Sequence, residues 1–75
     1  LDEAGSLSFV LNQRTDVTIN IYSVNGKLVK TINNSNMATG KHLIDLDMSG
    51  EGKGTYIVQL EAGNTSDVTR FIKLK

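Results

Sequence analysis

The sequence predicts an all-β fold: an immunoglobulin-like antiparallel β-sandwich of six or seven strands, formed by a single domain over residues 1–75. Three observations indicate this fold. Short segments of β-forming residues alternate apolar and polar side chains, and clusters of Gly, Asn, Asp and Ser separate them at intervals of about eight to twelve residues. No stretch of about ten residues holds the 3.6-residue apolar period of an amphipathic helix.

Two alternating segments open the predicted order of strands. The first is Leu7–Leu11, whose odd-numbered apolar residues share one face. The second is Val17–Val24, in which Val17, Ile19 and Ile21 lie on one side while Thr, Asn and Tyr residues lie on the other. Period-two alternation is typical of a strand that is buried on one face only, so both segments are expected to cover a core.

A hairpin is expected directly after the second strand. Asn25 and Gly26 both tolerate a positive φ, which a type I′ turn requires at its two central positions, and this pair is the strongest hairpin signal in the chain. The return strand is Lys27–Ile32. A polar loop, Asn33–Gly40, then leads to Lys41–Leu46, which we expect to be the partner of that return strand.

The second half of the chain repeats the pattern of loop and strand. A glycine-rich loop, Asp47–Gly54, leads into Thr55–Glu61, the clearest central strand. The turn Ala62–Asn64 separates this strand from the last one, Val68–Lys75. The core is expected to include Ile19, Ile21, Ile44, Val58 and Leu60.

Composition excludes several classes of protein. Eight basic residues balance eight acidic ones, whereas a nucleic-acid binder normally carries a clear positive excess. The chain has no Cys for a disulfide framework, and no apolar run approaches the ~20 residues of a transmembrane helix. The opening Leu1–Ala4 lacks an initiating Met, which we interpret as a cut made in a longer polypeptide.

Catalysis is not expected. His42 is the one histidine, and a Ser-His-Asp set could be assembled on paper from His42, Asp45 and one of several serines. Such sets are recognised by geometry, and nothing in the sequence fixes a geometry here. We therefore interpret His42 as a partly covered strand residue and the chain as no enzyme, with no cofactor.

A second candidate site is the segment Asp45–Glu51, which reads D-x-D-x-S-G like the first half of a calcium-binding loop. The closing position of such a loop should hold a bidentate Glu, but here it is Tyr56. The segment also overlaps a strand end, from which Leu46 and Met48 are expected to enter the core. We therefore expect no metal site.

Four segments, in order, resemble one known family. Val17–Val29 is similar to its hairpin "V-T-hydrophobic-x-hydrophobic-Y-x-x-x-G-K-x-V", and Thr39–Leu46 to its "G-x-H-x-hydrophobic-x-hydrophobic" strand. Met48–Gly50 with Gly54–Val58 resembles its "L-S-x…G-x-Y-hydrophobic-V" segment. Arg70–Lys75 is similar to its basic-aliphatic terminal strand. The family is that of the type IX secretion C-terminal sorting domains, and the likeness covers residues 7–75.

The resemblance implies a function that involves no catalysis. Domains of this family follow the functional domains of exported proteins in Bacteroidetes-type bacteria. They direct that cargo from the periplasm to an outer-membrane translocon. A sortase-like peptidase then commonly removes the domain and attaches the cargo to surface lipopolysaccharide. The implied partners are thus the translocon, the peptidase and the N-terminal cargo domains of the same chain, and the implied location is the periplasm in transit and then the cell surface or medium.

The resemblance also assigns roles to residues. Partner recognition is expected on the last strand, through basic and aliphatic side chains: Arg70, Ile72, Lys73, Leu74 and Lys75. A structural role is expected for the motif residues Asn25, Gly26, Gly54 and Tyr56. Of these, Tyr56 is expected to pack in the core rather than to meet a partner.

Two other functions stay open. An immunoglobulin-like accessory or spacer module would resemble the domain of flagellar hook-capping proteins, although that family usually carries a Trp-x-Gly-x-Asp stretch and this chain has no Trp. A carbohydrate-binding module would need exposed aromatic rings for sugar stacking. The chain has two Tyr and two Phe, most of which the core requires.

Overall fold

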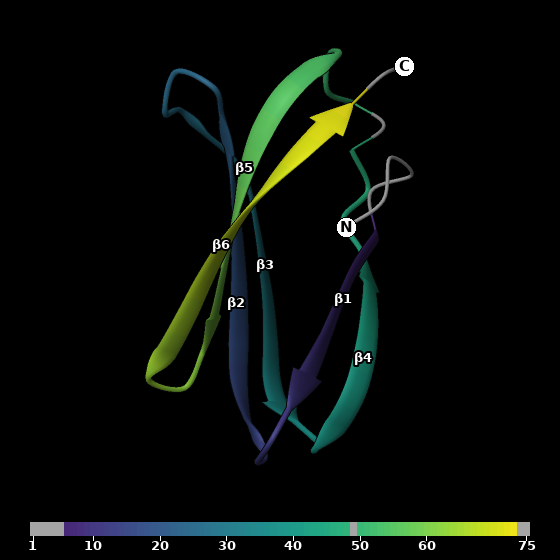
Figure 1. Ribbon diagram of the computed structural model, residues 1–75, viewed down its shortest axis with the longest axis vertical. Coiled ribbons are helices and arrows are strands. Elements are labelled where there is room, and N and C mark those ends of the chain that lie inside the picture. Colours follow the sequence, from purple (N-terminus) through teal and green to yellow (C-terminus); the bar gives the residue numbers. More distant parts are fainter. Residues whose placement is uncertain (1–5, 49, 74–75) are drawn as a thin grey trace.

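The computed structural model describes residues 6–48 and 50–73, and over these residues it forms an antiparallel sandwich of two sheets (Figure 1). The larger sheet has the strand order β3-β2-β5-β6, and the smaller sheet pairs β1 with β4. The prediction of an all-β sandwich is confirmed. Within the described ranges no helix is long and apolar enough to cross a membrane. The strands are β1 (Ser6–Leu11), β2 (Thr15–Ser23), β3 (Leu28–Met37), β4 (Gly40–Asp45), β5 (Gly54–Ala62) and β6 (Thr65–Lys73).

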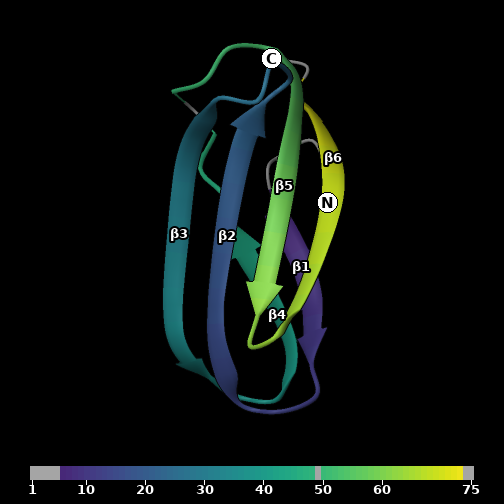
Figure 2. The ribbon, with the colours of Figure 1, turned by 90° about the vertical axis from the view of Figure 1, so that its left-hand side faces the viewer.

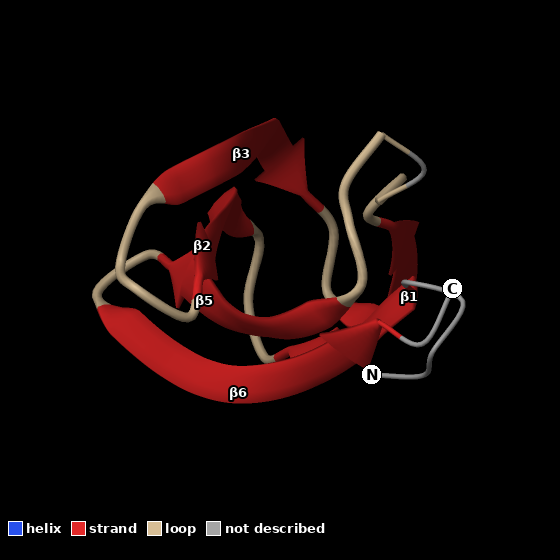
Figure 3. Cartoon of the chain, turned by 90° about the horizontal axis from the view of Figure 1, so that it is seen from above, coloured by secondary structure: helices blue, strands red, loops and turns tan. Residues whose placement is uncertain are grey.

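The two sheets lie face to face. Figure 2 shows the four strands of the larger sheet side by side, with β1 and β4 behind them. Seen from above, the larger sheet curves around one side of the molecule and the smaller sheet closes the other side (Figure 3). Such curvature follows from the right-handed twist of each strand, and it leaves the inner faces of both sheets to enclose one core.

The inner faces alternate as the sequence predicts. Ile19, Ile21 and Val58 are fully buried, which confirms these core assignments, whereas Ile44 and Leu60 are only partly buried and pack against the core. Leu46 and Met48 enter the core, as expected. The buried residues are Leu7, Leu11, Val17, Ile19, Ile21, Leu46, Met48, Tyr56, Val58 and Phe71.

The predicted polar loop Asn33–Gly40 is wrong, because strand β3 continues to Met37. Asn33 pairs with Thr18 in the ladder, and the hydroxyl of Thr18 donates to the side-chain oxygen of Asn33 at 3.0 Å. Strand β3 forms one edge of the larger sheet, so its polar side chains can stay in solvent while its backbone is paired. Polar composition alone therefore does not identify a loop at a sheet edge.

The expected pairing of the fourth strand is also wrong. β4 pairs with β1, from Ser6 opposite Asp45 to Leu11 opposite Gly40, and not with the return strand of the hairpin. The chain crosses from the larger sheet to the smaller one between Met37 and Gly40. This crossing is what makes two layers, since a further hairpin would only have widened the first sheet.

The β2–β3 hairpin forms, but its turn is not of type I′. Gly26 has φ +88°, while Asn25 is not among the described residues with positive φ. The backbone N–H of Gly26 donates to the carbonyl of Ser23 at 2.9 Å, and the N–H of Ser23 donates to the carbonyl of Lys27 at 2.8 Å. This pattern is that of a type I turn followed by a glycine bulge, in which only the bulge residue needs a positive φ.

Candidate recognition surface

The last strand of the described chain, β6, is an edge strand of the larger sheet. It pairs with β5 along its whole length, from Gly54 opposite Lys73 to Ala62 opposite Thr65. No other strand of the described residues pairs with its outer edge. An edge strand leaves a row of backbone N–H and C=O groups unpaired, so β6 offers both main-chain and side-chain groups to a partner. The sequence placed this strand at Val68–Lys75, and the structure places it at Thr65–Lys73.

Alternation along β6 divides the expected recognition residues between two faces. Phe71 points inward and is 2% exposed, so its neighbours Arg70 and Ile72 point outward. Ile72 is 52% exposed, and Arg70 is exposed and makes no ion pair with any described residue. Lys73 has the parity of Phe71 and is half-buried. The expected residues Leu74 and Lys75 lie outside the described residues.

Arg70 stands at the end of a row that crosses all four strands of the larger sheet. In the strand register Leu28 is opposite Tyr22, Tyr22 is opposite Ile57, and Ile57 is opposite Arg70. Leu28 is 50% exposed, while Tyr22 and Ile57 are half-buried. We call this row, together with Ile72, the outer patch. It combines exposed apolar area with one cation, and exposed apolar patches on small domains commonly mark interaction sites.

The sequence did not reveal the outer patch. Each of its residues falls on the solvent face of an alternating strand, where a single apolar residue is ordinary. The patch becomes visible only when the pairing of four strands is known. Tyr22 gave a partial signal, because it is an aromatic residue on the polar side of a strong alternation. Its hydroxyl lies 3.5 Å from the side-chain oxygen of Gln59, on the same outer face.

Tyr56 and Gly54 fix the start of β5 beneath this surface. The Tyr56 side chain is 7% exposed, and its hydroxyl donates to the carbonyl of Gly52 at 2.6 Å. Gly54 has φ +141°, in a region that residues with a Cβ rarely adopt. Tyr56 is therefore buried and tied to the loop before β5, and its hydroxyl is already bonded within the domain.

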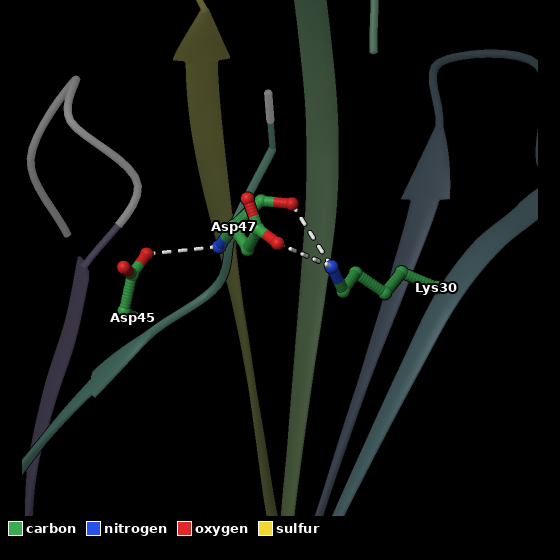
Figure 4. Close-up of polar contacts among 3 residues, drawn as sticks. All are labelled: Lys30, Asp45 and Asp47. Atoms are coloured by element: carbon green, nitrogen blue, oxygen red, sulfur yellow. Dashed lines mark hydrogen bonds and ion pairs between the residues drawn. The ribbon is translucent and has the colours of Figure 1, made fainter. Parts of the chain in front are cut away.

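The segment Asp45–Glu51, whose sequence resembles the first half of a calcium-binding loop, makes other contacts in the fold. The carboxylate of Asp45 accepts the backbone N–H of Asp47 at 2.9 Å, and Asp47 adopts φ +50° (Figure 4). The ammonium of Lys30 donates to the backbone carbonyl of Asp47 at 2.9 Å and lies 3.9 Å from its carboxylate. Over the described ranges, no three His, Cys, Asp or Glu side chains gather where they could hold a metal ion. The ammonium of Lys30 thus lies beside Asp47, where its positive charge would oppose a bound cation.

The contacts of His42 hold its ring in place on strand β4. Its ring stacks on Phe9, with the centroids 5.6 Å apart, and its Nε2 lies 2.7 Å from the carbonyl of Ala38. Asp45 is three residues away on the same strand, β4, and strand alternation places the two side chains on opposite faces. The fold therefore does not bring His42 and Asp45 together as two members of a Ser-His-Asp triad.

Comparison with known protein families gives a match over most of the chain. Residues 4–74, nearly the whole chain, match the family described as "Secretion system C-terminal sorting domain". None of the curated proteins compared with the chain matches it.

Proposed function

We propose that this chain, which belongs to the family of secretion system C-terminal sorting domains, directs a larger exported protein through the type IX secretion system to the outer membrane or cell surface. Membership makes the chain a C-terminal sorting signal for type IX secretion. The cargo is the remainder of the exported protein, N-terminal to this domain. In transit the domain lies in the periplasm, folded, and there it meets the outer-membrane translocon.

The observation that carries the proposal is the family match over residues 4–74. The geometry supports it, because a domain whose function is to be recognised needs an accessible and distinctive surface. The outer patch and the free edge of β6 form one continuous surface of this kind on the larger sheet. We assign partner recognition to this surface, with Arg70 and Ile72 as its exposed residues on β6, and we keep Lys73, Leu74 and Lys75 as expected recognition residues because they follow directly in the sequence.

Recognition at this surface combines two contributions. The exposed parts of Ile72 and Leu28 supply apolar area, worth roughly 25 cal/mol per Å² removed from water. The guanidinium of Arg70 can form a bidentate pair with a carboxylate of the partner, and such a pair fixes geometry more than it adds affinity. We therefore expect the translocon to present an apolar surface with an acidic residue opposite Arg70.

The domain itself performs no chemistry in this proposal. A sortase-like peptidase supplies the bond cleavage, and the sandwich serves only as the part that is recognised. The engagement of His42 with Phe9 and the carbonyl of Ala38 is consistent with that division.

A secretion assay tests the proposal. The domain is fused behind a reporter that carries a secretory signal, and the reporter is located in a host with a type IX system. Export of the reporter supports a sorting signal. Retention of the intact, folded fusion in the periplasm contradicts it and favours an accessory or spacer module.

A further inference from the structure

A groove of about 530 Å³ opens between the two sheets on the side where β1 and β6 lie. Its floor is the inner face of β5 and β6, and its wall is β1 with the residues that follow it. In Figure 1 the lower part of β6 diverges from β1. The floor residues are Val58, Leu60, Ala62, Thr65, Asp67 and Thr69.

The groove exists because the two sheets differ in width. The larger sheet has four strands and the smaller one has two, so among the described residues no strand lies opposite part of the inner face of β6. Thr65, Asp67 and Thr69 have the inward parity of Phe71, yet all three are exposed. An inward face without a covering strand is an incomplete layer of the sandwich.

Strand β1 presents its free edge to this groove. Among residues 6–48 and 50–73 it pairs with β4 on one side and with no strand on the other. Every residue from Leu7 to Leu11 lines the groove, whereas β5 and β6 contribute alternate residues. A strand that faces a groove lines it with alternate residues, whereas a strand that turns its edge toward the groove lines it with consecutive residues. The backbone N–H and C=O groups along this edge are therefore available for pairing.

One charged residue lines the groove, Asp67. It is opposite Leu60 in the β5–β6 register, and its carboxylate makes no hydrogen bond or ion pair with the described residues. A ligand in the groove therefore meets apolar side chains at Leu60 and Val58 and a negative charge at Asp67, which favours a ligand with apolar groups and a cation.

We propose that this groove accepts an extended segment of a partner polypeptide, which adds to β1 as a third strand of the smaller sheet and places one Lys or Arg side chain against Asp67. Main-chain hydrogen bonds to β1 provide affinity, and alternate side chains on the floor set the register. The proposal rests on the groove and the strand edge alone, so it stands or falls independently of the sorting function.

Synthetic peptides provide the probe. The segment Leu7–Leu11 is on the order of 15 Å long at ~3.3 Å per residue, so a peptide of about six residues matches it. The probe is fluorescein-labelled Val-Thr-Lys-Thr-Val-Thr, in which Val, Lys and Val share one face. The matched peptide has Glu in place of Lys. We expect saturable binding of the Lys peptide to the folded domain, about fivefold tighter than that of the Glu peptide.

The protein variant Asp67→Asn tests the cation contact. Asp67 is exposed, so the variant should keep the melting temperature of the unchanged domain while binding the Lys and Glu peptides equally. Absence of saturable binding by the Lys peptide overturns the proposal. So does a preference for the Lys peptide that persists in Asp67→Asn.

Backbone methylation tests strand addition itself. Two versions of the Lys peptide carry N-methyl groups on alternate residues, so that each blocks one edge of the peptide. Only one edge can pair with β1, so one version should lose binding and the other should retain it. Equal binding by both versions overturns the proposal. Concentration-dependent dimerisation of the domain that the Lys peptide cannot displace also overturns it, because the occupant would then be a second copy.

Discussion

Tyr56 and Phe71 are direct cross-strand partners on β5 and β6, and their rings pack with centroids 6.5 Å apart and an interplanar angle of 36°. Both side chains are buried, and the hydroxyl of Tyr56 is bonded to the carbonyl of Gly52. This pair anchors the last strand to the core. Because side chains alternate along a strand, the burial of Phe71 also turns Arg70 and Ile72 toward solvent.

Replacement of Phe71 should lower the stability of the domain far more than replacement of its neighbour Ile72. Phe71→Ala removes a ring that is 2% exposed, and the loss of burial together with the cavity should lower the free energy of unfolding by about 3 kcal/mol or more. Ile72→Ala is the matched control, because Ile72 is 52% exposed, and it should cost under about 1 kcal/mol. Urea denaturation measures both values. Equal losses would contradict the inward position of Phe71.

The stability of the β2–β3 hairpin should depend strongly on Gly26 and only weakly on Asn25. Gly26→Ala places a Cβ on a backbone with φ +88°, so it should cost roughly 1–2 kcal/mol of stability. Asn25→Ala should cost less than about 0.5 kcal/mol, since Asn25 has no positive φ and its side chain only accepts an exposed bond from the Ser23 hydroxyl. Thermal unfolding of the two variants separates them. Comparable losses would instead indicate the type I′ turn that the sequence predicts.

Calcium should leave the stability of the domain unchanged. The carboxylate of Asp45 is engaged by a backbone N–H, and the ammonium of Lys30 lies against Asp47. An ion that bound only the folded state would raise the melting temperature by mass action. Thermal unfolding with and without millimolar calcium is the measurement. A clear rise that Asp47→Asn abolishes would mean that the loop binds the ion after all.

The charge of the outer patch should matter for export more than charge elsewhere on the surface. Arg70→Glu reverses the single cation of the patch, and Lys41→Glu reverses an exposed cation on the smaller sheet. Both variants should fold, because both side chains are exposed. In the reporter assay we expect Arg70→Glu to retain most of the reporter in the periplasm and Lys41→Glu to export it normally. Equal export by the two would place recognition elsewhere on the sandwich.

Much of the fold could be predicted because apolar and polar side chains alternate along single strands. The buried face of β2, with Val17, Ile19 and Ile21, follows directly from a period of two, and so does the burial of Val58 on β5. The pairs Asn25–Gly26 and Gly63–Asn64 correctly marked turns between strands, whereas the asparagines of the predicted loop Asn33–Gly40 lie within β3. What these local signals do not contain is the choice of strand partners, which depends on contacts between distant parts of the chain.

The remainder required the structure for definite physical reasons. Its alternation lets β4 pair with β3 or with β1, and the crossing of the chain between the two sheets is what places it beside β1. In β6 both faces carry apolar residues, with Val68 and Ile72 on one face and Phe71 on the other. Alternation alone therefore does not say which face is buried, and in the structure the buried side chain is Phe71. The outer patch joins residues from four strands, so no single segment of the sequence could reveal it.

The most direct test of the sorting function is the location of the reporter fused to the intact domain, compared with the same fusion lacking Ile72–Lys75. The deletion removes the end of the edge strand but leaves Phe71 and the core in place, so most of the sandwich should survive. We predict that the intact fusion leaves the periplasm and that the truncated fusion remains there, folded and resistant to protease. An intact, folded fusion that stays in the periplasm would contradict the account.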